Sequence, residues 1–332
     1  MKLVPVNRPV TIHSVRFAER WFPQLLRHTD SSLILWINWG GDAAFAPSMH
    51  MRSADNGHTW GEPESNVPRH AFSHSLADHE LFELDAVGIS DPAAPADAVF
   101  RGAWSFPDRL GDQPVRDFVR MHLPSIKRSP LAASTSGYPT HHWWPLWNAL
   151  HGRDDMTEDE ILIGGLDVTT AITLDDGRLL ALGYGRHKDS ADGHTTIFTI
   201  ESADNGRTWT ETGITANGDE LGADPNEATM VRLRDGRLYV AMRYDGVTMD
   251  LEKAVLHHMW SSDDGQTWTT PEPIRLIDSD HMPASVWPRA KVLEDGTLVM
   301  SYGRPGKHII FDPSGTGTQW QGRLDLTKYE QE

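Results

Sequence analysis

A small set of carboxyl and guanidinium side chains has the chemistry to transfer protons and to hold an anion. The segment PNEATMVRLRDGRLYVAMR contains Glu227 and Arg243, and two similar segments end in Arg186 and Arg304. A carboxyl group can act as a general acid or base, and a guanidinium matches a carboxylate through two parallel hydrogen bonds. An ordinary ion pair between a glutamate and a strand-end arginine explains the same pattern. The elements that position these residues are therefore needed to choose between the two interpretations.

The arginines end segments that recur at a regular interval. LDDGRLLALGYGR, LRDGRLYVAMR and LEDGTLVMSYGR have their turn glycines at Gly177, Gly236 and Gly296, which are 59 and 60 residues apart. Such a period indicates one supersecondary unit repeated along the chain. An Asp-Gly pair between apolar residues predicts a β-hairpin, because the favoured turns need positive φ, which Gly and Asp tolerate.

A second motif repeats in step with the first. SADNGHTW at residues 53–60 returns as SADNGRTW at 202–209 and SSDDGQTW at 261–268, with a degenerate copy, DPSGTGTQW, at 312–320. Its Ser and Asp side chains can bond nearby backbone amides, while Trp packs beneath the turn. Calcium binding is the alternative, but one carboxylate per turn falls well short of the roughly six to eight oxygens that calcium takes. The motif is therefore predicted to be structural.

Each repeat contains four short strands, which is typical of a propeller blade. One unit includes TTAITL, RLLALGYG and TTIFTIES, and further units begin near residues 225 and 284. LLRHTDSSLILWINW and SMHMRSADNGHTW predict an earlier blade, and LFELDAV, AVFRGAWSF and FVRMHLPSI predict one more, with a loop insertion around 120–160. The N-terminal VTIHSV could close the ring. We expect one domain over residues 1–332.

The repeated S-x-D-x-G-x-T-W resembles the Asp box, or BNR repeat, of the sialidase (neuraminidase) superfamily. This resemblance implies an all-β, six-bladed sialidase-like β-propeller, with the last blade incomplete in this chain. It also implies an exo-acting glycoside hydrolase that removes a terminal, acidic sugar from a glycan. In that family the Asp boxes lie at the blade periphery, away from the substrate.

The resemblance also suggests roles for individual residues. Glu227 would activate a tyrosine nucleophile, and Arg243 would belong to a triad that grips the substrate carboxylate. Arg304 resembles the second arginine, and Arg186 is its equivalent by repeat position. The third arginine of the family lies in an R-I-P motif, whereas this chain reads ERWFPQLL around Arg20. That departure weakens the expected grip on a carboxylate.

The general acid of the family lies on a loop before the first Asp box, where INWGGDAAFAPSMHMRS places Asp42. A turn residue is the alternative interpretation of an Asp after Gly-Gly. Asp42 and Glu227 could together supply the two groups that a glycosidase needs. The nucleophilic tyrosine of the family has no clear counterpart. Tyr329 is too close to the C-terminus to serve as that counterpart. Tyr184, Tyr244 and Tyr302 flank strand ends near the candidate arginines, where a packed strand residue is the alternative interpretation.

Histidine and tryptophan gather in YPTHHWWPLWNALHG, residues 138–152. His141 and His142 could bond sugar hydroxyls, and Trp143 and Trp144 could stack on sugar faces. A hydrophobic plug over the blades explains the tryptophans equally well. The chain has no H-E-x-x-H or comparable spacing, so we expect no zinc and no other cofactor.

Composition narrows the possible partners. The 332 residues carry a net charge of −17, and the 30 Lys and Arg are scattered, which argues against nucleic acid and anionic membranes as partners. The chain has no cysteine, its first 23 residues lack the apolar run of a signal peptide, and no window is apolar enough to span a membrane. These features predict a cytoplasmic protein whose partner is a glycan.

Two other functions fit the same sequence. A polysaccharide lyase on a similar propeller would use His and Tyr to abstract a proton beside an arginine-neutralised uronate. A carbohydrate-binding propeller without turnover is the third interpretation. The sequence leaves the sugar, the linkage, the stereochemical outcome and the oligomeric state open.

Overall fold

The computed structural model describes residues 20–27, 31–39, 48–67, 72–75, 80–89, 109–110, 113–114, 121–130, 167–186, 194–203, 210–245, 254–284, 286–303 and 307–329. The chain divides into two compact units. One includes Thr169–Glu201 and Glu211–Glu332, and the other includes Val10–Val168 and Ser202–Thr210. Within the described ranges, no helix has the length and apolar character that crossing a membrane requires.

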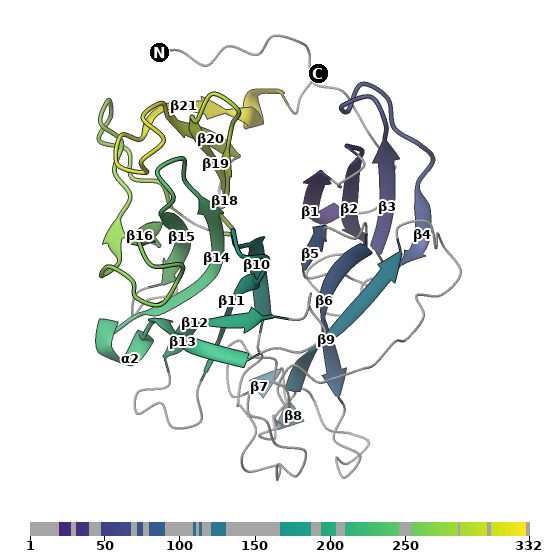
Figure 1. Ribbon diagram of the computed structural model, residues 1–332, viewed down its shortest axis with the longest axis horizontal. Coiled ribbons are helices and arrows are strands. Elements are labelled where there is room, and N and C mark those ends of the chain that lie inside the picture. The colour runs from purple at the N-terminus through teal and green to yellow at the C-terminus, as the bar shows by residue number, and fades with distance from the viewer. Residues whose placement is uncertain are drawn as a thin grey trace. The chain divides into compact units, whose positions relative to one another are not determined.

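The unit that holds most of the C-terminal half contains three four-stranded sheets, each ordered as in the chain (Figure 1). The first sheet comprises β10 (Asp167–Thr173), β11 (Leu179–Arg186), β12 (Thr195–Ser202) and β13 (Thr210–Ala216). The second comprises β14 (Asp224–Arg232), β15 (Leu238–Asp245), β16 (His257–Ser261) and β17 (Glu272–Pro273). The third comprises β18 (Arg289–Val292), β19 (Leu298–Tyr302), β20 (His308–Asp312) and β21 (Gln321–Asp325). Two short helical turns, α2 (Gly218–Leu221) and η2 (Leu326–Tyr329), complete the described elements of this unit.

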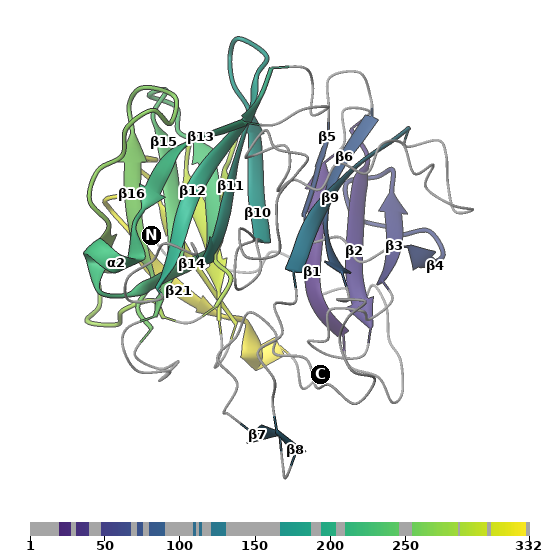
Figure 2. The same ribbon diagram turned by 90° about the horizontal axis from the view of Figure 1, so that it is seen from below.

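The other unit begins with a four-stranded sheet of β1 (Arg20–Arg27), β2 (Leu33–Trp39), β3 (Ser48–Ser53) and β4 (Glu64–Val67). A three-stranded sheet follows, with β6 (Glu80–Ile89) between β5 (Phe72–Ser75) and β9 (Met121–Pro130). A two-stranded ribbon joins β7 (Arg109–Leu110) and β8 (Gln113–Pro114). Figure 2 shows these strands from a second direction.

The predicted all-β class and the four-stranded repeats are confirmed. The predicted strand LFELDAV falls on β6 and most of FVRMHLPSI falls on β9, while VTIHSV, AVFRGAWSF and residues 131–160 of the expected insertion lie outside the described residues. Five of the described sheets have three or more strands, so the count of six blades stays a prediction. The single-domain organisation also stays a prediction.

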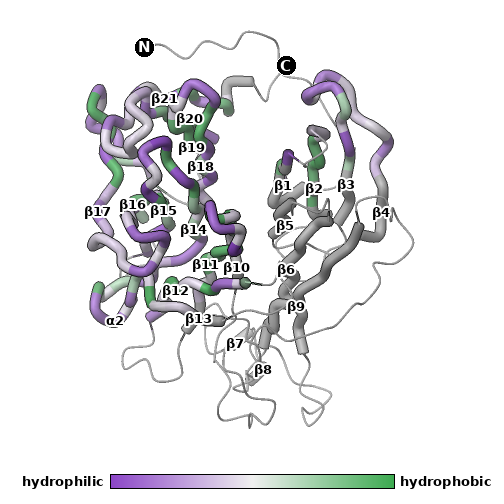
Figure 3. The backbone as a smooth tube through the Cα atoms, viewed as in Figure 1, coloured by the Kyte–Doolittle hydropathy of each residue, from purple (hydrophilic) through white to green (hydrophobic). Residues whose placement is uncertain are grey.

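Apolar side chains fill the spaces between successive sheets of the larger C-terminal unit. One cluster joins the β10–β13 and β14–β17 sheets through Leu182, Val240 and Met242. Another joins β14–β17 to β18–β21, where Tyr239 and Trp320 are fully buried. Figure 3 shows hydrophobic residues along strands such as β2 and β19, with hydrophilic residues at the turns. Burial of these strand faces supplies the main driving force for folding.

The Asp box at residues 261–268 closes its turn through its own side chains. Asp263 accepts a hydrogen bond from Ser261 at 2.7 Å and from the Thr267 amide at 2.9 Å, and the Trp268 indole donates to the Gly265 carbonyl at 3.1 Å. The box at residues 53–60 has the same bonds. The predicted structural role of the motif is therefore confirmed for these two copies. Most of the third intact copy, 202–209, lies outside the described residues.

The repeated hairpin turns differ in one detail from the expectation. In the three turns that join the first and second strands of the sheets, only the glycines have positive φ, at 88°, 89° and 90°, and the Asp before each does not. The Leu174 amide donates to the Arg178 carbonyl and the Gly177 amide to the Leu174 carbonyl, which makes a three-residue loop with a left-handed Gly. A type I turn with a bulge, rather than a two-residue turn, explains the repeated D-G.

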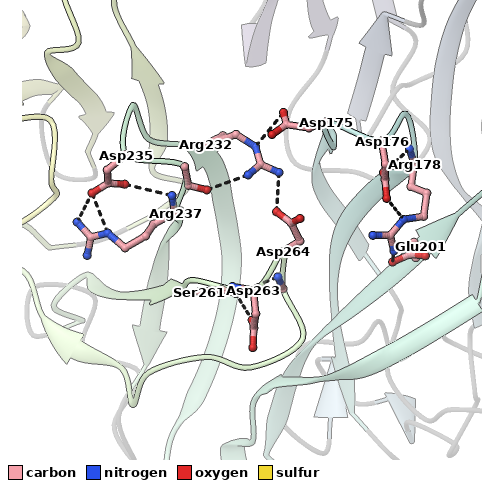
Figure 4. Close-up of polar contacts among 12 residues, drawn as sticks. Asp175, Asp176, Arg178, Glu201, Arg232, Asp235, Arg237, Ser261, Asp263 and Asp264 are labelled. Carbon is pink, nitrogen blue, oxygen red and sulfur yellow. Dashed lines mark hydrogen bonds and ion pairs between the residues drawn. The ribbon is translucent and has the colours of Figure 1, made fainter.

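Arginine side chains link these turns to their neighbours (Figure 4). Arg232 Nη2 lies 2.8 Å from Oδ1 of Asp264, which belongs to the Asp box of the same sheet. Arg232 Nε lies 3.9 Å from Oδ1 of Asp175 in the preceding sheet. Arg178 pairs with Glu201 in the same sheet. Arg232 thus links two successive sheets, whereas Arg178 links turns and strands within one sheet.

Candidate functional site

Glu227 lies in an irregularity at the beginning of β14. Asn226 pairs with Arg243 of β15 and Thr229 pairs with Ala241, so Glu227 and the residue after it oppose a single residue of β15. This two-against-one arrangement is a β-bulge, which turns a side chain away from the direction that regular pairing would give it. Glu227 has φ of +40°, a left-handed conformation that non-glycine residues rarely adopt.

A second left-handed residue holds the same carboxylate. The backbone N–H of Trp287, at φ +49°, donates to Glu227 Oε2 at 3.0 Å. Trp287 lies just before β18, in the next sheet of the same unit. Two strained backbone positions that meet at one buried carboxyl group indicate that the surrounding structure holds this group in a fixed orientation.

Arg243 connects Glu227 to a second acid. Its Nη1 lies 3.4 Å from Glu227 Oε2, and its Nε donates to Asp245 Oδ1 at 2.9 Å. The Asn226 amide donates to the other Asp245 oxygen at 3.1 Å. All four side chains are buried, with between 3% and 7% of each residue exposed. The result is a buried network in which one guanidinium bridges two carboxylates.

Burial changes the proton affinities in this network. Desolvation raises the pKa of Glu227, although Arg243 and the Trp287 amide oppose the rise. Desolvation would lower the pKa of Arg243, but Glu227 and Asp245 outweigh it, so that pKa is raised. Arg243 therefore keeps its charge, while Glu227 becomes a stronger base than an ordinary glutamate. A carboxyl whose pKa moves towards neutrality is suited to proton transfer.

A second arginine, Arg289, lies beside this network. Its Nη1 donates to the Thr169 carbonyl at 2.7 Å, and its guanidinium carbon lies 5.3 Å from the centre of the Trp287 ring. Burial lowers the pKa of Arg289 to about 10, and the charge of Glu227 opposes this fall. The first strands of three successive sheets, β10, β14 and β18, thus meet at this point (Figure 1).

The sequence interpretation missed Arg289, Trp287 and Asp245. The repeat interval was the signal that could have found the first two. Trp287 follows Glu227 by 60 residues, and Arg289 follows Thr169 by 120, which is one and two repeats. Residues at equal repeat positions lie side by side where the first strands of neighbouring sheets converge.

Of the predicted site residues, the structure brings Glu227 and Arg243 together. Arg20 begins β1 and Arg186 ends β11, but their side chains are outside the described part of the chain. The roles proposed for all of these residues stay predictions. Six other predicted site residues lie wholly outside the described ranges: Asp42, Arg304, His141, His142, Trp143 and Trp144.

The described tyrosines near the candidate arginines are packed side chains. Tyr184 and Tyr302 are buried, and the Tyr302 hydroxyl lies 3.0 Å from His281 Nε2. Tyr244 stacks on His257 with ring centres 3.8 Å apart. Burial raises the pKa of Tyr302 to about 12 and also raises that of Tyr244, which disfavours the nucleophilic phenolate.

Among the residues that the structure describes, no group of three His, Asp or Glu side chains is arranged to hold a metal ion. The described groups of the site are carboxyl, guanidinium and indole groups. One carboxyl is suited to proton transfer, and two arginines next to it can stabilise negative charge.

Comparison with known proteins identifies relatives of this architecture. The family described as BNR repeat-like domain matches residues 145–328. A protein of unknown function from Dyadobacter fermentans has a TM-score of 0.62 at 17% identity, over 96% of this chain and 85% of that one. Trypanosoma rangeli sialidase in complex with the inhibitor DANA has a TM-score of 0.54 at 14% identity, over 92% of this chain and 47% of that one. Penicillium chrysogenum α-L-arabinanase complexed with arabinobiose has a TM-score of 0.56 at 14% identity, over 92% of this chain and 80% of that one. No curated protein matches the sequence.

Proposed function

The chain belongs to the BNR repeat-like domain family and has the sialidase-like propeller fold, and from this premise we propose that it is an exo-acting glycoside hydrolase. Its substrate would be a glycan from which it removes a terminal, acidic sugar. The observation that carries the proposal is the buried Glu227 in a left-handed β-bulge, held by Arg243 and by the Trp287 amide. Such strain at a buried acid is typical of functional sites.

Glu227 supplies the proton acceptor in this proposal. Hydrolysis needs one carboxyl to protonate the departing glycosidic oxygen and a second group that attacks the sugar or activates water. Glu227, ionised, would take a proton from the attacking water or from a nucleophilic hydroxyl as the new bond to the anomeric carbon forms. Asp42 would donate a proton to the leaving oxygen as the old bond breaks.

Arg243 and Trp287 serve the same step by holding the base. Both bond to Oε2, so they fix the plane of the carboxyl group without removing its capacity to accept a proton. Holding a catalytic group in its reactive orientation avoids the cost of ordering it during the reaction. The raised pKa of Glu227 adds to this effect because it strengthens the base.

The structural neighbours support a carbohydrate substrate, but they include enzymes that act on two different kinds of sugar. One is a sialidase bound to the inhibitor DANA, and another is an α-L-arabinanase bound to arabinobiose. The chain spans about half the length of the first and most of the second. The choice between an acidic and a neutral terminal sugar therefore depends on the residues of this chain.

A panel of aryl glycosides tests the activity. Sialic acid, glucuronic acid, arabinose and galactose derivatives with a chromogenic leaving group would be incubated with the full chain, and the released phenol would be measured. We expect release from an acidic glycoside and little from the neutral ones. Binding of these sugars without release from any of them would favour the carbohydrate-binding propeller instead.

A polysaccharide lyase is the second candidate, and one contact favours it. His281 lies between Tyr302, whose hydroxyl is 3.0 Å from Nε2, and Arg323, whose Nη1 is 3.0 Å from Nδ1. Such a lyase would use histidine and tyrosine to abstract the proton, and arginine to neutralise the uronate carboxylate. A lyase would convert a uronate-containing polysaccharide into an unsaturated product that absorbs ultraviolet light, whereas a hydrolase would not.

A further inference from the structure

We propose that Arg289, rather than Arg243, binds the acidic group of the substrate, and that Arg243 is a positioning residue for Glu227. This inference rests on the proposed function, because it names the group that would recognise an acidic sugar in the same site. It differs from the expectation drawn from the sequence, in which Arg243 grips the substrate.

The contacts of Arg243 leave little capacity for a further anion. Its Nη1 faces Glu227 and its Nε is bonded to Asp245, and its side chain is only 5% exposed. With all three groups ionised, two carboxylates against one guanidinium leave a net charge of −1. A substrate carboxylate would approach this arginine against two like charges in a poorly solvated place, which is unfavourable. Arg243 is better suited to holding Glu227 in place.

Arg289 has the opposite surroundings. Its direct contacts within the described part of the chain are the neutral Thr169 carbonyl and the face of Trp287. The charge of Glu227 acts on it from nearby, but no carboxylate there lies within ion-pair distance of it. One of its five N–H donors is used by the carbonyl, so a fork remains for a carboxylate. Burial removes water from its guanidinium, and this desolvation lowers the pKa of Arg289. An arriving anion would relieve this cost, since a desolvated cation gains most from a counter-ion.

The neighbouring Thr169 adds a second ligand for an anion. Its carbonyl accepts from Arg289, while its Oγ1 is buried and has no hydrogen-bond partner in the described part of the chain. A buried hydroxyl without a partner is costly unless a ligand or water satisfies it. A carboxylate held by Arg289 could accept a hydrogen bond from this hydroxyl.

Trp287 connects the anion site to the reacting carboxyl. Its backbone N–H bonds Glu227, and its ring lies against the guanidinium of Arg289. An acidic sugar held by Arg289 would therefore lie close to the proton acceptor, with its orientation fixed by one residue. Recognition of the acidic group and proton transfer would then occur at adjacent points on β14 and β18.

Calorimetric titration with paired ligands tests the assignment without requiring turnover. N-acetylneuraminic acid and glucuronic acid would each be compared with its methyl ester on wild type, Arg289→Gln, Arg289→Lys and Arg243→Lys. Arg237→Gln is the control, because it removes the same charge from a turn where Arg237 pairs with Asp235. Circular dichroism would confirm folding, and Arg289→Lys, which keeps the charge and the aliphatic stem, covers the case in which Arg289→Gln does not fold.

We expect wild type and Arg237→Gln to bind one of the acids at least about tenfold more tightly than its ester, the usual size of a charge-assisted hydrogen-bond pair. Arg289→Gln should abolish that preference, and Arg289→Lys should reduce it because an ammonium lacks the planar fork. Arg243→Lys should keep the preference.

Three outcomes would overturn the assignment: wild type that binds neither acid, wild type that binds acid and ester equally, or a preference lost in Arg243→Lys but kept in the Arg289 variants. A preference that depends on Arg289, found together with no hydrolysis of any glycoside, would remove the hydrolase proposal and leave the Arg289 assignment standing.

Discussion

At the scale of single residues, the site combines features that each oppose folding. Five described non-glycine residues have positive φ, and three of them, Ser31, Asn56 and Asp264, are short polar residues in turns. The other two, Glu227 and Trp287, are large residues that bond to each other. Strain and a buried acid at one point are hard to explain by stability, because both cost free energy. A role in proton transfer explains why they occur together.

The pH dependence of stability follows from the raised pKa of Glu227. The folded chain keeps the proton on this group to a higher pH than the unfolded chain does, so its contribution is fully present below the ordinary glutamate pKa of about 4 and is lost as pH rises through the folded value. Glu227→Gln removes the titration. We expect wild type to lose stability relative to this variant as pH rises from about 4 towards neutrality.

Urea unfolding of both proteins at a series of pH values measures this difference. Glu294→Gln is the matched control, because Glu294 is an exposed residue in a turn of the same unit. A difference between wild type and Glu227→Gln that stays constant across the series would show that Glu227 titrates alike in the folded and unfolded chains.

At the scale of elements, the turns could be predicted and the site could be predicted only in part. Asp boxes and D-G hairpins depend on contacts within eight residues, so their sequence determines them locally. Glu227 and Arg243 were found through resemblance to a family. The role of Arg289 depends on how β10, β14 and β18 align across repeats, which local patterns do not describe. The bulge at Glu227 also has no local signal such as glycine.

Alanine substitutions at two glycines with the same backbone conformation distinguish the cost of backbone strain from the cost of a packing clash. Gly177 has φ of +88° and open space where a Cβ would be, whereas Gly317 has φ of +82° and a Cβ there would lie 2.5 Å from the buried Tyr239 ring. Gly177→Ala should cost only the left-handed backbone term, about 1–2 kcal/mol. Gly317→Ala should cost about 1–3 kcal/mol more because the rigid ring cannot move aside.

Chemical unfolding of the two glycine variants measures the loss of unfolding free energy in each. Activity should survive in any variant that remains folded, because both glycines belong to turns of the fold. Equal losses of unfolding free energy would mean that the Tyr239 ring yields, and that the packing around the degenerate Asp box is looser than the structure indicates.

At the scale of the whole molecule, charge makes local recognition necessary. A chain with a net charge of −17 repels an anionic sugar at long range, and salt screens that repulsion over about 8–10 Å. Binding of an acidic substrate therefore requires a cation at the site whose charge is not already neutralised. Arg289 meets this requirement better than Arg243, so one molecule can be both acidic overall and selective for an acidic terminal sugar.

The most direct measurement of the central claim is the turnover number of Glu227→Gln on the glycoside that wild type hydrolyses fastest. Wild type and Glu294→Gln would be assayed beside it under conditions in which all three are folded. We predict a loss of at least about a hundredfold in Glu227→Gln, as expected for a missing proton-transfer group, with Glu294→Gln unchanged. A turnover number for Glu227→Gln close to that of wild type would contradict the account, because it would show that the strained, buried carboxyl takes no part in the reaction.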